Sequence, residues 1–573
     1  MPHADLILLH PPSVYDFRKR TALYGPISDV VPSTPIYEMY PIGFMTIAEY
    51  LERHGHSVRI INVAMRMLKR RRFRAERLIE SLRPLAFGID LHWLAHAQGS
   101  LEIAGIVKKY HPHIPVIFGG LSASYYHEEL IRYPQVDYVV RGDCAEEPLR
   151  QLIEKIKRGE PPEGVPNVTW RNRSGGVQVN EITHISPHLN NISFDYRRLM
   201  KSSVRYRDLI GYSPFLGWFN YPIVAVIPWK GCVHNCVLCG GSARFYRRIC
   251  GKHRPSYRSP QQLADDIGLI SKYIKAPIII LNDIRQAGCE YAEKLLKGIE
   301  EKRVNNHIAM ELFYPASRKF LESVARSIPN FNIQISPESH DEEVRRAFGR
   351  AYDNRSLEQT VESALELGCR RVDLFFMIGL PKQTFGSVQE TVMYCERLLE
   401  KHSGKYRGRI HPYISPLSPF LDPGSLAFED PQKYGYRLFY RTVEEHRKAL
   451  LQPSWKYILN YETEWMSRDE IVAATYEAAH ELNRVKARYG LISQKEANKI
   501  EKRIREGRDL IRRIDEAVAL KDEKQREIEM AELKTRLNRL KNTSIGKKNE
   551  LQWPVRLIRF NLPGVVRAVM TKN

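Results

Sequence analysis

The sequence predicts an α/β protein in three parts: a doubly wound parallel sheet, a second series of alternating strands and helices, and a helical C-terminal region. Continuous apolar runs of strand length alternate with helical segments up to about residue 430, which is typical of parallel sheets covered by helices. Beyond that point charged segments with helical periodicity follow. We expect domains at residues 1–160 and 221–430, a connector at 161–220 and helices over 431–573.

Five apolar segments are the predicted strands of the first domain: residues 6–9, 58–63, 85–90, 115–120 and 136–143. The amphipathic segment 41–55 is the predicted helix after the first strand, and Gly55 closes it. Ligands of doubly wound sheets bind at the carboxyl ends of the strands. The residues that directly follow each strand are therefore the candidate site of this domain.

Six apolar segments, separated by helical segments, are the predicted strands of the second domain. They are residues 223–227, 278–281, 308–312, 331–335, 372–377 and 409–414. Six such units fit a partial (βα)6 barrel. The spacing alone fits another open sheet equally well.

A group of cysteines directly follows the first of these six strands. Cys232, Cys236 and Cys239 have the spacing C-x3-C-x2-C. Three thiolates on one short loop can hold three irons of a four-iron cluster and leave the fourth iron open to a ligand. Zinc, with Cys250 as a fourth ligand, is the alternative, but the second paired-cysteine knuckle of structural zinc sites is missing.

The cysteine loop and the strands after it resemble the radical S-adenosylmethionine (SAM) domain, over residues 221 to about 420. This resemblance implies a [4Fe–4S] cluster on the three cysteines and SAM on its open iron, from which one electron releases a 5′-deoxyadenosyl radical. It also implies SAM contacts after the later strands, at Asp283, Ser336, Glu338, Gly379 and Pro381. Leu238 and Gln383 depart from the family pattern, in which an aromatic residue and Glu are common.

The first domain, joined to such a second domain, resembles the cobalamin-dependent class of radical SAM enzymes. The matching segments are 8–12, 41–56, 118–124 and 137–148. The resemblance implies a Rossmann-like cobalamin-binding domain with contacts at Pro11, Pro12, His92, Trp93, Gly119, Gly120, Ser122, Arg141 and Gly142. The two glycines would let the backbone approach a large flat ligand. A different ligand on the same fold, or none, is the alternative.

His92 lies in Asp90-Leu-His-Trp-Leu-Ala95, which is similar to the Asp-x-His-x-x-Gly motif of cobalt-ligating histidines. That motif follows the first strand of its domain, whereas this segment follows the third and has Ala95 in place of glycine. The role of cobalt ligand is therefore not transferred to His92. We expect the loop beneath the corrin, with His92 or Trp93 touching or shielding the lower face of cobalt.

Together the two resemblances imply C-methylation of an unactivated carbon through a 5′-deoxyadenosyl radical and methylcobalamin. An external electron donor of the ferredoxin or flavodoxin type is implied as well, and no catalytic residue is assigned. Cyclisation or another C–C bond-forming step on a lipid-like substrate is one alternative. A non-catalytic sensor that carries the cluster and a corrinoid is the other.

The net charge of +22 leaves nucleic acid, an anionic membrane and acidic small molecules open as partners. No RNA-binding module accompanies the basic run Arg66–Arg74, so we expect a solvated helix face there and no nucleic acid. We expect a small-molecule or lipid-like substrate instead. The absence of long apolar runs and of a secretory pattern, with scattered cysteines, predicts a cytoplasmic protein.

The tail over residues 551–570 combines apolar side chains with arginines, and two interpretations stand. In the first, the tail contacts the inner face of an anionic membrane. The residues in contact would be Trp553, Phe560 and the valines, with Arg556, Arg559 and Arg567 at the headgroups. In the second, the tail packs on the barrel and the substrate is soluble.

Overall fold

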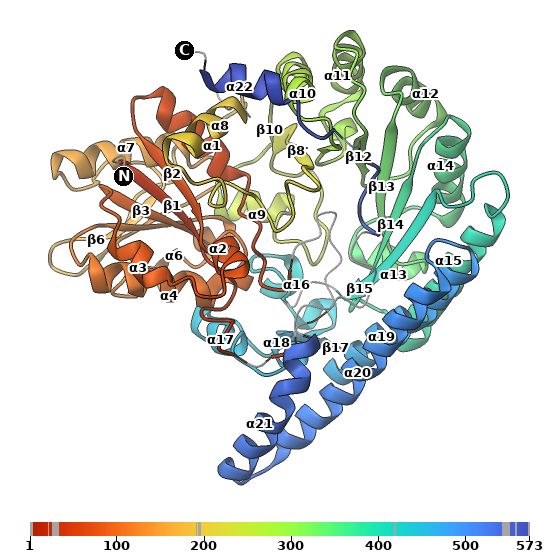
Figure 1. Cartoon of the computed structure of the whole chain (residues 1–573). Helices are drawn as coiled ribbons and strands as arrows, with labels where there is room; N and C mark the ends of the chain where they lie inside the picture. The colour runs from red at the N-terminus through yellow and green to blue at the C-terminus, as the bar shows by residue number, and fades with distance from the viewer. Residues whose placement is uncertain are drawn as a thin grey trace.

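The computed structural model describes residues 4–20, 22–23, 25, 34–190, 192, 196–416, 420–540, 550–555 and 558–570. Two α/β domains lie side by side, and C-terminal helices run along the outer edge of the second domain (Figure 1). The predicted fold class is confirmed, including the parallel sheets and the helical C-terminal region.

The first domain is built on a seven-stranded sheet with the order β2-β1-β3-β4-β5-β6-β7. All five predicted strands are present and parallel, and the strand order reverses between β1 and β3. The strands are β1 (Leu6–His10), β2 (Val58–Asn62), β3 (Ala86–Asp90), β4 (Val116–Gly119), β5 (Tyr138–Val140), β6 (Val168–Arg171) and β7 (Val177–Val179). Antiparallel β6 and β7 come from the segment expected to be a connector, and they extend this sheet.

Helices cover both faces of this sheet, and buried apolar side chains from the strands and helices form the core between them. The helices are α1 (Gly43–Arg53), α2 (Val63–Lys69), α3 (Ala75–Glu80), α4 (Ala97–Tyr110), α5 (Leu121–Tyr125), α6 (His127–Leu130) and α7 (Glu146–Arg158). Helix α8 (Tyr196–Arg205) follows and leads towards the second domain.

The second domain is a six-stranded parallel sheet with the order β15-β14-β13-β12-β11-β8. Its strands are β8 (Val224–Val226), β11 (Ile278–Ile280), β12 (Ile308–Leu312), β13 (Phe331–Glu338), β14 (Val372–Ile378) and β15 (Ile410–Pro416). Its helices are α9 (Ala243–Ile249), α10 (Pro260–Tyr273), α11 (Cys289–Glu301), α12 (Arg318–Ser327), α13 (Glu342–Phe348), α14 (Asn354–Glu366) and α15 (Phe385–Lys401). The first and last strands are edges of the sheet, as a partial (βα)6 barrel requires.

Side chains alternate between the two faces of this sheet. Val224, Ile278 and Ile308 belong to the core shared with the helices. Their neighbours Ile223, Ile279 and Ala309 form a separate cluster, in which Trp553 is buried at 2% exposure. The C-terminal tail therefore packs on the inner face of the barrel at Trp553, as the second interpretation of the tail predicts.

The C-terminal region closes the outer edge of the barrel. Short elements come first: α16 (Leu426–Glu429), β16 (Tyr436–Leu438), α17 (Val443–Ala449), α18 (Trp455–Ile458) and β17 (Tyr461–Thr463). The helices expected in this region include three long ones: α19 (Arg468–Arg488), α20 (Gln494–Ala519) and α21 (Glu523–Leu540). Helix α19 packs on α15 and on the edge strand β15, and α22 (Leu562–Met570) ends the described chain (Figure 1).

Candidate cluster and cofactor site

The three predicted cluster cysteines lie on the loop that leaves the carboxyl end of β8 through β9 (Trp229–Lys230). Two sulfurs accept backbone hydrogen bonds: Cys232 from His234 N–H at 3.4 Å, and Cys239 from Gly241 N–H at 3.3 Å. Such N–H···S bonds are among the contacts that set the properties of iron–sulfur clusters. All three thiols are free of disulfides, so this loop can supply three thiolate ligands.

The spread of the sulfurs favours a cluster over a single zinc ion. Tetrahedral zinc with Zn–S bonds of about 2.3 Å would hold its sulfurs about 3.8 Å apart. The three described Sγ atoms do not come within 4.8 Å of one another as a group, and Cys250 does not complete such a group. The donor set therefore fits a larger metal–sulfur unit.

Glu338 and its partner Arg350 lie beside the cysteine loop. Arg350 Nη1 lies 2.8 Å from Glu338 Oε1 and donates to the carbonyl of Ser336 at 2.5 Å. The guanidinium also reaches Cys236, whose pKa is raised by burial and lowered by Arg350. The second carboxylate oxygen of Glu338 is buried without a partner among the described residues, and burial raises the pKa of this carboxyl to about 7. A ligand hydroxyl donating to that oxygen fits the role that the resemblance to SAM-binding sites implies.

Asp283 is engaged by its own chain. Its Oδ1 accepts from Arg285 N–H at 3.1 Å, its Oδ2 accepts from Phe313 N–H at 3.1 Å, and the Arg285 guanidinium pairs with it at 2.5 Å. The carboxylate thus ties the end of β11 to the end of β12. Asp283 thus has a structural role, and its contact with SAM stays a prediction.

Gln383, which departs from the family pattern, locks the turn that contains Gly379 and Pro381. Its Oε1 accepts from Gly379 N–H at 2.8 Å and Leu380 N–H at 3.2 Å, while its Nε2 donates to Met377 O at 2.9 Å. A carboxylate could accept both bonds but could not donate the third. Gly379 has a φ of 95°, and a Cβ there would lie 2.5 Å from the Tyr461 hydroxyl.

A buried polar cluster fills the point where the first sheet reverses its order, between β1 and β3. His10 Nδ1 lies 2.9 Å from Asp90 Oδ1, and both His10 Nε2 and His96 Nε2 contact the carbonyl of Tyr37, at 3.0 and 2.9 Å. Asp90 Oδ2 and His96 Nδ1 are buried without partners among the described residues. Two unsatisfied polar atoms at the switch point of a doubly wound sheet fit a bound polar ligand.

The loop after β3 carries His92 and Trp93. The carbonyl of His92 accepts from the N–H and the hydroxyl of Ser122, both at 3.3 Å, and the His92 side chain is exposed rather than packed. A Cβ on Gly120 would lie 2.4 Å from His92 Cα, so this glycine is needed for the loop itself. Its neighbour Gly119 would meet nothing closer than 3.7 Å.

The other predicted cobalamin contacts lie at the ends of β1 and β5. Pro11 and Pro12 are buried, and the carbonyl of Pro12 passes so close to Gly99 that a Cβ there would lie 1.8 Å away. Arg141 is buried and donates to the carbonyl of Asn180, which directly follows β7. Burial lowers the pKa of Arg141 to about 10. Gly142, with a φ of 91°, donates its N–H to Ser124 Oγ at 2.9 Å.

Asp422, which no sequence pattern singled out, lies between the loop after β3 and the cysteine loop. Its Oδ2 accepts from Gly240 N–H at 3.0 Å, next to Cys239. Burial raises the pKa of this carboxyl, while the Gly240 N–H and the nearby Trp93 side chain oppose that rise. A Cβ on Gly240 would lie 2.5 Å from Asp422 Cβ. One carboxylate thus connects the predicted corrin-side loop with the cysteine loop. No local motif marks Asp422 or Arg350, because their partners lie far away in the sequence.

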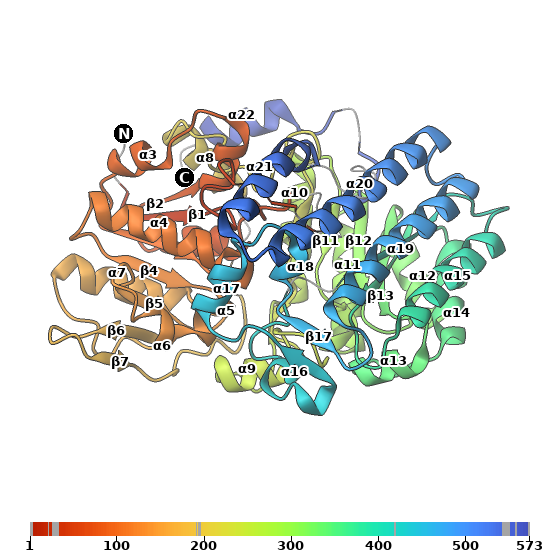
Figure 2. The same cartoon turned by 90° about the horizontal axis from the view of Figure 1, so that it is seen from below.

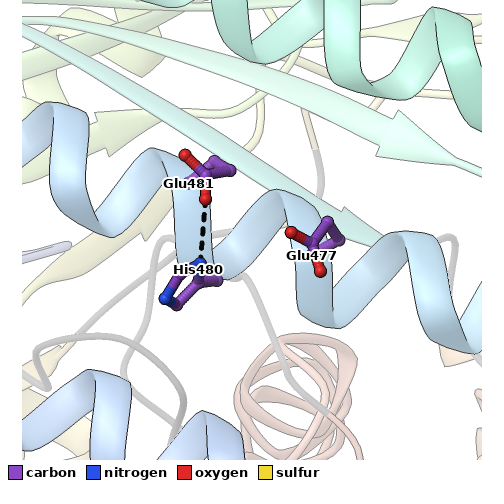
Figure 3. A group of neighbouring side chains, drawn as sticks. All are labelled: Glu477, His480 and Glu481. Carbon is purple, nitrogen blue, oxygen red and sulfur yellow. Dashed lines mark hydrogen bonds and ion pairs between the residues drawn. The ribbon is translucent and has the colours of Figure 1, made fainter.

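One further group of metal-ligand types lies on α19 (Figure 3). Glu477, His480 and Glu481 have ligand atoms within 4.8 Å of one another. His480 contacts Glu481 and Glu501, both at 2.9 Å, while Glu477 pairs with Arg508 at 2.8 Å. Because these atoms already have protein partners, we assign no metal to this group.

Two families match the chain in the order predicted. Residues 29–153 match the B12 binding domain, and residues 226–395 match the radical SAM superfamily. The chain belongs to the cobalamin-dependent radical SAM enzymes. The cofactors of this B12-dependent radical SAM enzyme are a [4Fe–4S] cluster, SAM and cobalamin, and the donor atoms described above fit them.

Relatives of this B12-dependent radical SAM enzyme include two curated proteins. An uncharacterized methyltransferase of Pyrococcus horikoshii is 21% identical over 366 residues, which are 62% of this chain and 73% of the relative. The hopanoid C-3 methylase of Methylococcus capsulatus is 25% identical over 279 residues, which are 47% of each chain.

Solved structures of two other proteins share the fold. The cobalamin-dependent SAM radical enzyme OxsB matches 96% of this chain and 78% of its own, with 14% identity and a TM-score of 0.55. The radical SAM methyltransferase TsrM of Kitasatospora setae matches 76% of this chain and 78% of its own, with 15% identity and a TM-score of 0.53. Among the described residues, no helix is long and apolar enough to cross a bilayer.

Proposed function

We propose that this enzyme methylates an unactivated carbon of a small, lipid-like molecule. The observation that carries the proposal is the meeting of two loops at Asp422: the loop of Cys239 and Gly240 and the loop of Trp93. This meeting supports the proposal, because it brings the loop of Cys239 close to the loop that follows β3 of the first domain. When bound, the cluster with SAM supplies a 5′-deoxyadenosyl radical, and cobalamin supplies the methyl group.

The chain's own residues bind and shield the reactants. Glu338, held by Arg350, would accept hydrogen bonds from SAM hydroxyls through its unpartnered oxygen. Trp553 fills the inner face of the barrel at the amino ends of the strands, opposite the cysteine loop. Trp553 therefore keeps water out of that end of the barrel, which protects a reactive radical.

Two features support a lipid-like substrate and a working place at the inner face of the cell membrane. One relative is named a hopanoid methylase. The other feature is a row of exposed apolar side chains on α22 in the C-terminal tail, formed by Leu562, Val566 and Met570. A ferredoxin or flavodoxin would supply the electron, and nucleic acid has no part in the proposal.

The test is anaerobic purification with cobalamin, followed by incubation with SAM, a low-potential reductant, and either lipid or aqueous cell extracts. We expect 5′-deoxyadenosine and S-adenosylhomocysteine together, and a lipid that gains the mass of one methylene. A product that loses two hydrogens would instead favour cyclisation. Bound cluster and SAM without any 5′-deoxyadenosine would favour the non-catalytic sensor.

A further inference from the structure

The most exposed apolar side chains of the described residues gather on and beside α8 and α22. Seven large apolar side chains are at least 57% exposed, and six of them lie here: Val204, Leu209, Ile558, Leu562, Val566 and Met570. The last three recur every four residues, so they form one row along α22. Large exposed apolar groups gathered in one place mark an interaction surface.

The opposite side of α22 is anchored to the molecule. The N–H of Lys275 donates to Arg559 O at 2.7 Å, and the N–H of Asn561 donates to Tyr273 O at 2.9 Å. The ring of Phe560 packs on Trp218, with ring centres 5.8 Å apart. Helix α22 then packs across α8 and α10. The exposed row is therefore the outer face of a docked helix, and Phe560 is not available to a membrane.

The basic run of the first domain lies in the connection between α2 and α3 and is only partly helical. Helix α2 ends at Lys69, and the next helix begins at Ala75. Six exposed cations line this stretch: Lys69, Arg70, Arg71, Arg72, Arg74 and Arg77. None of the six forms an ion pair with another residue that the structure describes, and four of the arginines line an open hollow of about 810 Å³.

Hardly any acidic charge balances these cations. Within residues 69–78 Glu76 is the one acidic residue, and its carboxylate accepts a hydrogen bond from the Tyr15 hydroxyl at 2.5 Å. The expected solvated helix face is thus a loop rich in arginine, because Arg70 is extended and ends α2. A surface of this kind attracts anions.

The basic loop and the apolar row belong to one continuous face. Lys69 Nζ lies 5.8 Å from the ring centre of Phe219, and Phe219 packs on Phe560 directly before α22. Arg66, at the start of the run, pairs at 2.5 Å with Asp208, the neighbour of Leu209. Figure 2 shows α3, α8 and α22 along the same edge of the molecule.

We propose that this face docks on an anionic lipid bilayer. The apolar row of α22 would enter the boundary between headgroups and acyl chains, and the arginines of residues 70–77 would lie at the lipid phosphates. A bilayer matches both halves of the face, because it offers an apolar interior beneath a layer of negative charge. The inference rests on the proposed function, since docking there gives the enzyme access to a lipid-like substrate.

Vesicle co-sedimentation of the full chain tests the docking face. The probes are phosphatidylcholine vesicles with and without phosphatidylglycerol, at low salt and at about 0.5 M NaCl. We expect binding to the anionic vesicles to exceed binding to the neutral ones about tenfold or more, and to fall at high salt. Equal binding to both vesicles, or none to either, would overturn the proposal.

Two triple variants address the two halves of the face. Leu562→Gln with Val566→Gln and Met570→Gln removes the row, and Arg70→Gln with Arg71→Gln and Arg72→Gln removes cations. Each should weaken vesicle binding about tenfold or more. Two control variants change exposed residues elsewhere: Ile528→Gln on α21, and the triple variant Lys495→Gln, Lys499→Gln and Lys502→Gln on α20. Their vesicle binding should stay within about twofold of that of the unchanged protein.

Other occupants of the face predict different outcomes. If only the arginine variant lost binding and RNA competed with the vesicles, the face would bind nucleic acid. If the α22 variant bound vesicles like the unchanged protein but had a lower mass in sedimentation velocity, a second copy of the chain would cover the row. Either result would contradict the bilayer.

Formation of 5′-deoxyadenosine without vesicles separates docking from chemistry. We expect every variant to form it like the unchanged protein, because none of these residues lies at the cysteine loop. Methylation without vesicle binding would remove the docking proposal alone. Vesicle binding without 5′-deoxyadenosine would remove the proposed function alone.

Discussion

Cys236 lies in the middle of the cysteine loop, where it is buried and contacts Arg350. Replacing it by alanine removes one of three thiolates, and a site with two cannot hold the cluster in place. We expect Cys236→Ala to lose its iron, its sulfide and its visible absorption, and to cleave no SAM. Cys289→Ala changes an exposed cysteine outside the loop and should keep all of these. A tightly bound zinc in the unchanged, anaerobically isolated protein would contradict the assignment.

The buried environment of His446 makes the free energy of unfolding depend on pH. Its Nδ1 donates to Thr442 O at 2.7 Å, its Nε2 accepts from Asn460 Nδ2 at 3.1 Å, and burial lowers its pKa from 6.5 to about 4. The unfolded chain takes up a proton below pH 6.5, whereas the folded chain does so only near pH 4. Folding is therefore destabilised as pH falls through this window, by up to about 3 kcal/mol from this residue.

Urea unfolding of His446→Gln at pH 7.5 and at pH 5 measures that contribution. The variant should be less stable than the unchanged protein at pH 7.5, because it loses two buried hydrogen bonds. Its stability should then fall less between the two pH values. His253→Gln, at an exposed histidine, should keep the original pH dependence. An unchanged slope in His446→Gln would show that this histidine does not titrate as described.

At the scale of elements, Asp422 links the loop after β15 to loops of both domains. Asp422→Ala leaves the buried N–H of Gly240 without its acceptor, at a cost of about 1–3 kcal/mol, and removes the carboxylate beside the Trp93 side chain. We expect a lower melting temperature and fewer methylated products for each 5′-deoxyadenosine formed, with the iron content unchanged. Asp422→Asn keeps one acceptor oxygen and should restore most of the methylated product formed for each 5′-deoxyadenosine. If both variants lowered this ratio equally, Asp422 would have a different role.

The elements that could be predicted from sequence are those with strong local patterns. Each of the eleven predicted strands is an apolar run between helices, and all eleven are present. Strand β7 was missed because its side chains are exposed and it has no apolar run. The number of long C-terminal helices could not be predicted from the sequence, because only a short break at residues 520–522 separates α20 from α21.

Candidate site residues divide in the same way. The cysteine spacing is local and readable in the sequence. Arg350 and Asp422 act through partners that only the fold brings near, so composition and spacing carry no sign of them. Gly120 was expected to make room for a ligand, whereas its close neighbour is the backbone of His92. A glycine in a sequence indicates a close approach without saying what approaches.

At the scale of the whole molecule, the C-terminal tail completes the barrel. Trp553 Nε1 donates to Asp373 Oδ2 at 3.0 Å, and its N–H donates to the Tyr221 hydroxyl at 3.1 Å. Arg371 donates to the carbonyls of Glu550 and Gln552, at 2.5 and 3.0 Å. The tail thus joins residues before β8 and at the start of β14. The outer part of the same tail, α22, carries the exposed row.

Two truncations separate these functions of the tail. Ending the chain after Asn549 removes Trp553 and exposes the inner face of the barrel, and the loss of a buried tryptophan costs about 3–5 kcal/mol. Ending it after Asn561 removes α22 but keeps every contact of Trp553 and Arg371. We therefore expect the shorter protein to melt at a lower temperature and the longer one to melt like the full chain. Both should lose vesicle binding, because both lack the row of Leu562, Val566 and Met570. Equal stability of the shorter protein and the full chain would mean that the tail is no part of the barrel core.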